Sequence, residues 1–131
     1  MPRFIPHDEY GMLHGLFTDP MSSLHPADRL ALQHLLPRLK PQRDPDVLLK
    51  HVRLNIPISI ELVVEQQRMQ ITLVLPQYAN PRQKRISLFS PLGEALYGLA
   101  EGDETRCQLP LGEKRLRVLE IHPNLATSTS F

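Results

Sequence analysis

Apolar and polar residues alternate along two stretches in the second half of the chain. In Ile58–Val64 and in Met69–Leu75, an aliphatic residue or methionine occupies every second position. A period of two over seven residues predicts a strand with one buried face. We expect Glu65–Arg68 to form the hairpin turn between them, although this segment contains none of the Gly, Asn or Asp residues that tight turns favour.

Three more strands and one short helix are predicted downstream. The strands are Arg85–Phe89, Glu104–Leu109 and Lys114–Ile121, of which the last two form a hairpin. Between the first and second of them, Ser90 is placed as the N-cap and Pro91 as the first residue of a helix that ends at Gly98. A mostly antiparallel sheet with one helix on a face predicts an α+β fold.

The first 37 residues show a helical pattern instead. Asp8–Phe17 has acidic residues at its start and apolar residues behind them, which is typical of a short helix. Pro26 opens a second helix, whose leucines follow the spacing of one helix face. Joined by the segment Asp19–His25, the two would form a short helical hairpin.

Proline divides the chain. Of the 13 prolines, Pro37, Pro41 and Pro45 recur every four residues, and each blocks continuation of a helix. We therefore expect a linker at about 38–46. The predicted organisation is a helical hairpin with a Pro-rich linker over residues 1–45, followed by an α+β domain over residues 46–131.

Composition and charge narrow the class of protein. The chain has 131 residues, of which 41% are apolar, as expected for a single globular domain. A net charge of +1 argues against binding nucleic acid through bulk charge. Cys107 is the only cysteine, which excludes an internal disulfide and fits a reducing compartment. Without a signal peptide or a long apolar run, we expect a cytoplasmic protein that does not bind membranes.

No pattern typical of catalysis, cofactor binding or metal binding is found. Cys107 is predicted to be a buried thiol. The histidines of the first part are predicted to face solvent or to cap helices, with a metal site as the lesser alternative; they are His7, His14, His25 and His34. The acidic pairs are predicted to be solvated or to bond a turn; they are Asp8-Glu9, Asp44/Asp46 and Glu101/Asp103/Glu104. The basic cluster Lys114/Arg115/Arg117 is predicted to be a solvated face, with contacts to an acidic protein surface as the alternative.

The most specific local pattern lies between Phe89 and Asp103. Its elements are Ser90-Pro91-Leu92-Gly93, Ala95-Leu96, Gly98 and Gly102-Asp103, followed by Leu109-Pro110, Gly112 and Leu116–Glu120. This string resembles the C-terminal domain of the bacterial GreA/GreB transcript-cleavage factors. It is more similar still to their short relative, the regulator of nucleoside diphosphate kinase. The resemblance covers about 46–122, and the N-terminal helices fit the family only loosely.

The resemblance implies an FKBP-like α+β domain that docks on RNA polymerase at the rim of the secondary channel. In the family, the Ser-Pro pair at the start of the helix touches that rim, which carries over to Ser90 and Pro91. We expect Phe89, Leu92 and Glu94 to contribute to the same protein-binding site. An exposed helix N-terminus also offers free amide donors to the side chains of a partner.

The first part of the chain argues against the catalytic role of the cleavage factors. Their long N-terminal coiled coil carries a pair of acids that helps to hold a catalytic Mg²⁺. Here the predicted helices have at most about a dozen residues, or roughly 18 Å, and the connecting segment 19–25 has one acid. We therefore expect a polymerase-binding regulator that is not an enzyme and needs no cofactor.

Two other functions stay open at this point. The chain is alternatively a protein-interaction module that regulates another enzyme, as the name of the short relative suggests. The FKBP-like fold also suggests a peptidyl-prolyl isomerase, but the aromatic residues that would line such a pocket do not cluster in the sequence.

Overall fold

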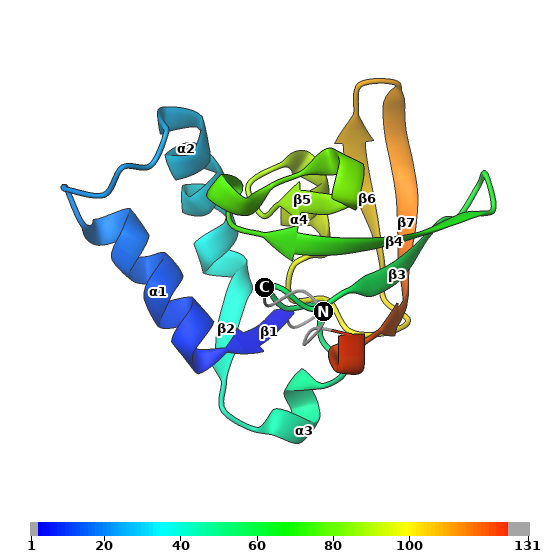
Figure 1. Cartoon of the computed structure of the whole chain (residues 1–131), viewed down its shortest axis with the longest axis horizontal. Helices are drawn as coiled ribbons and strands as arrows, with labels where there is room; N and C mark the ends of the chain where they lie inside the picture. Colours follow the sequence, from blue (N-terminus) through cyan, green and yellow to red (C-terminus); the bar gives the residue numbers. More distant parts are fainter. Residues whose placement is uncertain (1–2, 126–131) are drawn as a thin grey trace.

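The second part of the chain forms a five-stranded sheet in the computed structural model, which describes residues 3–125 (Figure 1). Its strands are β3 (Ile58–Leu62), β4 (Gln67–Val74), β5 (Arg85–Ser87), β6 (Glu104–Leu109) and β7 (Gly112–Ile121). They lie in the order β5-β4-β3-β7-β6, and the pairs are antiparallel except for β4 with β5. The predicted α+β class with a mostly antiparallel sheet is confirmed.

The alternating pattern has the predicted effect. Ile58 and Ile60 on β3 and Ile71 and Leu73 on β4 are buried, because they occupy every second position and point to one face of the sheet. The turn between these strands lies at Val63–Gln66, two residues earlier than expected. Gln66 supplies the left-handed backbone of this turn, with φ of 55°, in place of the glycine that such a position favours.

A short helix and three turns of 3-10 helix complete the second part, and the last of these turns covers residues 123–125. The connection from β4 to β5 contains η2 (Pro76–Tyr78) and η3 (Pro81–Gln83). The helix α4 (Pro91–Leu96) then lies between β5 and β6, where a helix was predicted. Tyr97 leaves the helical conformation, and Gly98 follows with φ of 84°, which other residues rarely adopt, in a turn closed by the Leu99 amide and the Leu96 carbonyl at 3.1 Å.

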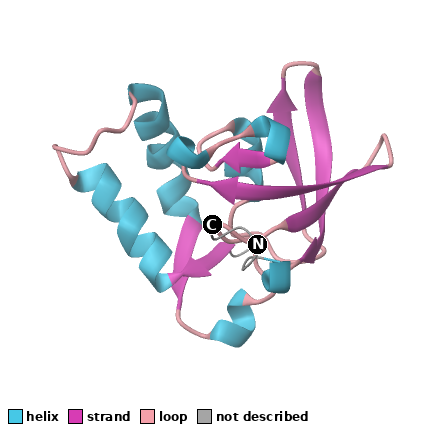
Figure 2. Cartoon of the chain, viewed as in Figure 1, coloured by secondary structure: helices cyan, strands magenta, loops and turns pink. Residues whose placement is uncertain are grey.

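The first part contains the two predicted helices and two strands that were not predicted (Figure 2). Its elements are β1 (Arg3–Pro6), α1 (His7–Thr18), α2 (Pro26–Leu35), η1 (Leu36–Arg38), β2 (Leu39–Gln42) and α3 (Pro45–Leu48). Figure 1 shows α1 and α2 on one side of the sheet, with α3 at the opposite end of the first part. Among residues 3–125, no helix is long and apolar enough to span a bilayer.

The linker expected at 38–46 is wrong. Residues Leu39–Gln42 form β2, which pairs in parallel with β1. Pro41 is compatible with this ladder because the sheet has only two strands, so each strand keeps a free edge. Pro45 starts α3, and the Asp44 side chain accepts a hydrogen bond from the Asp46 amide at 2.9 Å as its cap.

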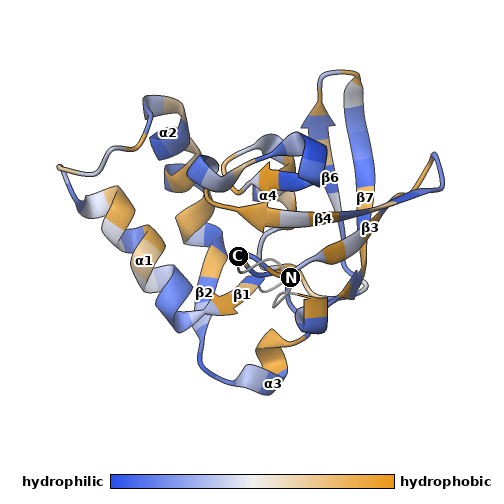
Figure 3. Ribbon diagram, viewed as in Figure 1, coloured by the Kyte–Doolittle hydropathy of each residue, from blue (hydrophilic) through white to orange (hydrophobic). Residues whose placement is uncertain are grey.

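The two parts share one hydrophobic core. Ile5, Leu13 and Leu35 of the first part belong to the same buried cluster as Ile60 and Leu96 of the second. Figure 3 shows hydrophobic residues on the strands and on α1, and a hydrophilic stretch along much of β7. The first part is therefore packed against the sheet, and the domain boundary after residue 45 stays a prediction.

Candidate protein-docking site

The corner at Ser90 is held by local hydrogen bonds. The Ser90 hydroxyl donates to the Ser87 carbonyl at 2.7 Å and accepts from the Gly93 amide at 3.1 Å. These two bonds fix the last residue of the strand segment to the first turn of α4, so Ser90 is the predicted N-cap. Pro91 follows as the first helical residue, where its missing N–H costs nothing.

Gly93 allows α4 to lie directly on the preceding segment. A Cβ atom added at Gly93 would lie 2.4 Å from the Ser87 carbonyl oxygen and 2.5 Å from that of Leu88. Both atoms belong to the backbone and cannot move aside. The backbone from Ser87 to Gly93 is therefore closely packed.

The predicted contact residues differ in how far they are exposed. Pro91 is exposed, and Ser90, Leu92 and Glu94 are partly exposed. Phe89 is only 7% exposed and belongs to the hydrophobic core. Its remaining surface lines an apolar groove against α1 and α2. Contrary to the prediction, Phe89 is therefore a core residue and does not belong to the exposed corner. Of the five predicted contact residues, Pro91 is the one in the exposed class.

Arg3 braces the C-terminal end of α4. Its guanidinium donates to the carbonyls of Glu94 at 2.6 Å and Ala95 at 3.2 Å, and more weakly to that of Tyr97 at 3.4 Å. These carbonyls belong to the last turn of a helix, where cations are favourable. Burial, followed by the charge of Arg38, lowers the pKa of Arg3 from its usual range, with Glu94 acting in the opposite direction. No local sequence signal predicts this contact, because the residues are more than 90 positions apart.

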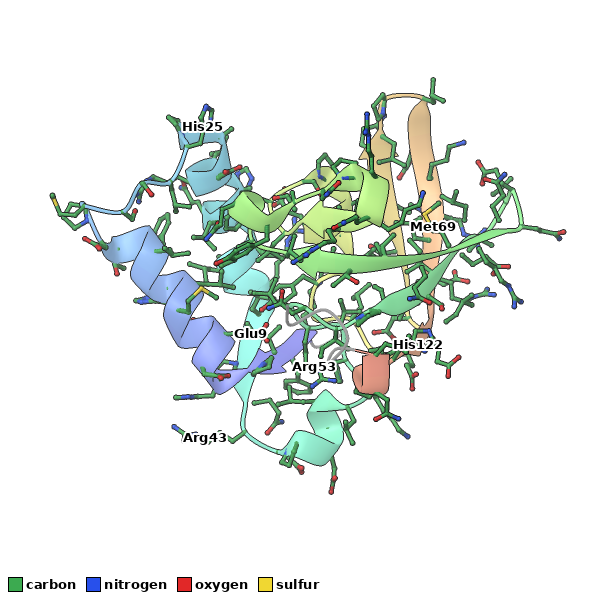
Figure 4. The ribbon with its side chains drawn as sticks, viewed as in Figure 1. Glu9, His25, Arg43, Arg53, Met69 and His122 are labelled. Atoms are coloured by element: carbon green, nitrogen blue, oxygen red, sulfur yellow. The ribbon has the colours of Figure 1, made fainter. Side chains whose placement is uncertain are left out.

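Glu9 forms a second connection between the two parts, and the expectation that it is solvated is wrong. Its Oε1 atom accepts from the Tyr97 hydroxyl at 2.6 Å and from the Leu54 amide at 3.2 Å. Figure 4 labels Glu9 on α1 and Arg53 on the segment after α3. Burial raises the pKa of Glu9, whereas the two hydrogen bonds and the charge of Arg53 act to lower it. Tyr97 is fully buried, and burial with the nearby Glu9 carboxylate raises its pKa well above the usual value.

The cysteine and histidine predictions are confirmed. Cys107 is 4% exposed, and burial, followed by the charge of Glu94, raises the pKa of its thiol. A buried thiol with a raised pKa is a poor nucleophile. The four histidines of the first part are exposed, and His25 also caps α2 by accepting from the Ala27 amide at 3.2 Å. Between residues 3 and 125 no three His, Cys, Asp or Glu side chains lie together as a metal site.

The acidic cluster near Gly102 has structural roles. Asp103 accepts a hydrogen bond from the Ala100 amide at 2.8 Å, which confirms that it bonds the turn. Glu101 accepts from the Ile121 amide at 2.9 Å and so connects the turn to β7. Glu104 is paired with Arg117 and with Arg115, the latter at 3.2 Å. These carboxylates are therefore occupied within the fold.

The basic cluster on β7 is also paired. Lys114 bonds Glu65, and Arg117 lies between Glu104 and Glu61, with 3.4 Å to the latter. All of these pairs are at least partly exposed, so each contributes little to stability. Their neighbouring acids offset the positive charge, which confirms a solvated face and argues against a free basic patch.

Comparison with known proteins places this fold in a family. The family described as transcription elongation factor, GreA/GreB, C-terminal, matches residues 48–123, more than half of the chain. The chain belongs to this family. The matched stretch includes the whole five-stranded sheet and the corner at Ser90. The resemblance seen in the sequence is thereby confirmed, while the closer similarity to the regulator of nucleoside diphosphate kinase stays a prediction.

Curated relatives match over part of their length. Transcription elongation factor GreA of Syntrophobacter fumaroxidans is 49% identical over 49 residues, which are 37% of this chain and 31% of the relative. Transcription elongation factor GreA of Thermoanaerobacter pseudethanolicus is 29% identical over 90 residues, which are 69% of this chain and 57% of the relative. The matched stretches thus span only 31% to 57% of these two relatives.

Solved structures resemble the chain over most of its length. The prokaryotic transcription elongation factor GreA/GreB from Nitrosomonas europaea superposes with a TM-score of 0.71 and 25% identity, covering 93% of this chain and 98% of that one. The GreA factor homolog 1 (Gfh1) protein of Thermus thermophilus gives a TM-score of 0.51 and 21% identity, covering 88% and 86%. The second likeness shows a shared fold alone.

Proposed function

We propose that the chain is a non-catalytic transcription regulator that binds RNA polymerase near the secondary channel, through the corner at Ser90 and Pro91. The match of residues 48–123 to the GreA/GreB elongation factor family carries this proposal. Such a family indicates a factor that acts on another enzyme rather than a conventional enzyme. The partner and the contact residues are our inference from that membership.

The geometry of the corner supports a docking role. Pro91 is exposed, and its pyrrolidine ring restricts the backbone at this position. The Ser90 cap fixes the start of the helix that presents Pro91. A contact surface that is already ordered loses little conformational entropy when it binds a partner. The exposed ring of Pro91 and the half-buried side chain of Leu92 are adjacent apolar groups, which suit the centre of a protein interface.

The helical hairpin supports a role without transcript cleavage. Its helices have 12 and 10 residues, so the longer one spans about 18 Å. Asp19 is the only acid in the connecting segment 19–25, and its Oδ1 atom accepts from the Met21 amide at 2.8 Å. A single carboxylate with one oxygen already bonded is a poor donor set for recruiting Mg²⁺.

Direct binding to purified core RNA polymerase tests the proposal. We expect the labelled chain to bind, and Pro91→Glu to weaken binding by at least about tenfold, which corresponds to about 1.4 kcal/mol. Leu111→Glu is the matched control, because Leu111 is 93% exposed in the turn between β6 and β7. Equal binding of both variants would remove the site assignment, and no binding of the unmodified chain would remove the proposal.

A cleavage assay with stalled polymerase tests the missing activity. We expect no stimulation of transcript cleavage above polymerase alone, with a GreA protein as positive control. Stimulation that disappears in Asp19→Ala would contradict the non-catalytic role. Affinity capture that recovers a different enzyme and no polymerase would favour the alternative of a module that regulates that enzyme.

A further inference from the structure

A groove of about 480 Å³ lies beside the exposed corner, between the two parts of the chain. Arg3, His34 and Arg38 line it from β1, α2 and η1. Pro91 and Glu94 of α4 line it from the second part, together with residues 105–108 of β6. The groove therefore begins at the residue that we place at the centre of the docking surface.

The charge of this groove is positive. Its lining residues include three arginines, Arg3, Arg38 and Arg106, and a single acid, Glu94. Arg38 is exposed, and within residues 3–125 its guanidinium forms no hydrogen bond or close ion pair. Arg106 is 71% exposed, and its ion pair with Glu113, which is 55% exposed, is as long as 4.0 Å. This pair therefore holds Arg106 weakly.

The pKa of Glu94 shows which charged groups act on its carboxyl. Partial burial raises the pKa of its carboxyl, whereas Arg38, His34 and Arg3 each act to lower it. Arg3 and Arg38 therefore act on this carboxyl from the first part of the chain. One carboxylate does not neutralise them, and the groove keeps an unmatched positive charge.

We infer that this groove binds an acidic segment of a protein partner, and that it continues the docking surface away from Pro91. This inference rests on the proposed function, since the acidic segment would belong to the same partner that contacts the corner. Charge complementarity supports this inference: exposed Arg38 and Arg106 line the groove from η1 and β6, and the one ion pair of Arg106 is a 4.0 Å contact with Glu113. The planar guanidinium of arginine can bind a carboxylate with two parallel hydrogen bonds.

Two observations favour a protein segment over a nucleic acid. β6 is an edge strand of the sheet, and an edge strand presents unpaired N–H and C=O groups that another peptide backbone can pair with. The net charge of the chain, +1, provides no wider basic surface for a nucleic acid.

Titration of the full-length chain with short peptides, followed by NMR, tests the groove without polymerase. The probes are a peptide that contains several glutamates, the same peptide with glutamine in their place, and a single-stranded RNA. We expect the acidic peptide to shift the amide signals of Arg38, Ala95 and Arg106, and Arg38→Glu or Arg106→Glu to weaken its binding at least fivefold. Lys50→Glu is the charge-matched control at an exposed residue outside the groove, and should change binding less than twofold.

The outcomes separate this inference from the proposed function. No shifts at the groove, or equal loss in Lys50→Glu, would overturn the groove assignment even if polymerase binds the chain. Shifts at the groove with RNA and none with the acidic peptide would make it a nucleic-acid surface and overturn the inference. In the polymerase assay, Arg38→Glu should weaken binding and reduce its salt dependence, whereas failure of the unmodified chain to bind would contradict the proposed function alone.

Discussion

The Arg3 guanidinium donates a 2.6 Å hydrogen bond to the backbone carbonyl of Glu94, 91 residues away. Through this bond, a strand at the start of the chain holds the last turn of the helix that carries Pro91. Gly98, just after that helix, also packs against Arg3, since a Cβ atom added at Gly98 would be 2.9 Å from the Arg3 Cβ. The first part of the chain therefore supports the candidate docking site as well as the core.

Replacing Arg3 by methionine should loosen α4. The substitution removes charge-assisted hydrogen bonds to three carbonyls, and we expect it to lower the free energy of unfolding by about 1–3 kcal/mol. Hydrogen exchange provides the local measurement: the Tyr97 amide, bonded to the Gly93 carbonyl at 3.0 Å, should exchange faster. Arg3→Lys keeps the charge and should restore part of the protection. An unchanged Tyr97 exchange rate in Arg3→Met would show that the brace has no effect.

Glu9→Gln should change how stability depends on pH. The pKa of Glu9 is raised by burial above its ordinary 4.5, so the protonated form is favoured in the fold. This contribution to stability is fully present below pH 4.5 and is lost as the pH rises through the raised pKa. We therefore expect the unmodified chain to lose stability relative to Glu9→Gln between about pH 4 and neutral pH, measured by urea unfolding.

Glu9→Ala is the informative partner of that substitution. Both hydrogen bonds end on the same oxygen, Oε1, so glutamine can still accept from Tyr97 and Leu54, whereas alanine leaves both donors without a partner. We expect Glu9→Ala to cost about 1–3 kcal/mol at pH 7. If Glu9→Gln cost as much as Glu9→Ala at that pH, the negative charge rather than the acceptor oxygen would be the important feature.

Gly93→Ala should destabilise the corner. The added methyl group would lie within 2.5 Å of two backbone carbonyl oxygens, so we expect a loss of about 3 kcal/mol in the free energy of unfolding. Gly15→Ala is the matched control, because nothing lies within 4 Å of a Cβ atom added there in α1. That substitution should stabilise the helix by about 0.5–1 kcal/mol. Denaturation curves should show a lower free energy of unfolding for Gly93→Ala and a higher one for Gly15→Ala. Equal effects of the two substitutions would contradict the close packing at Gly93.

Features set by neighbouring residues were predictable from the sequence. The strands around Ile58 and Ile71 follow from period-two burial, and the Ser90 cap follows from a serine and a proline in adjacent positions. The helix α2 follows in the same way from Pro26 and the leucines behind it. In each case the deciding interactions lie within a few residues of one another.

Features set by distant contacts were not predictable. The segment around Pro41 is predicted to be a linker because proline disfavours regular structure. In the fold it pairs with β1 along one edge, and its other edge has no partner strand. Glu9 looks like an ordinary acid in a first helical turn, and only the fold brings it to Tyr97. Phe89 is adjacent to the exposed corner in sequence, but the core takes its side chain. Tertiary packing decided all three.

A chain with a photo-crosslinking residue in place of Pro91, incubated with core RNA polymerase and irradiated, tests whether the corner contacts the polymerase. We expect a covalent adduct with a polymerase subunit from position 91 and none from the same residue in place of Leu111, which is 93% exposed and lies in another turn. An adduct from position 111 and none from position 91, with the chain bound to polymerase, would contradict it.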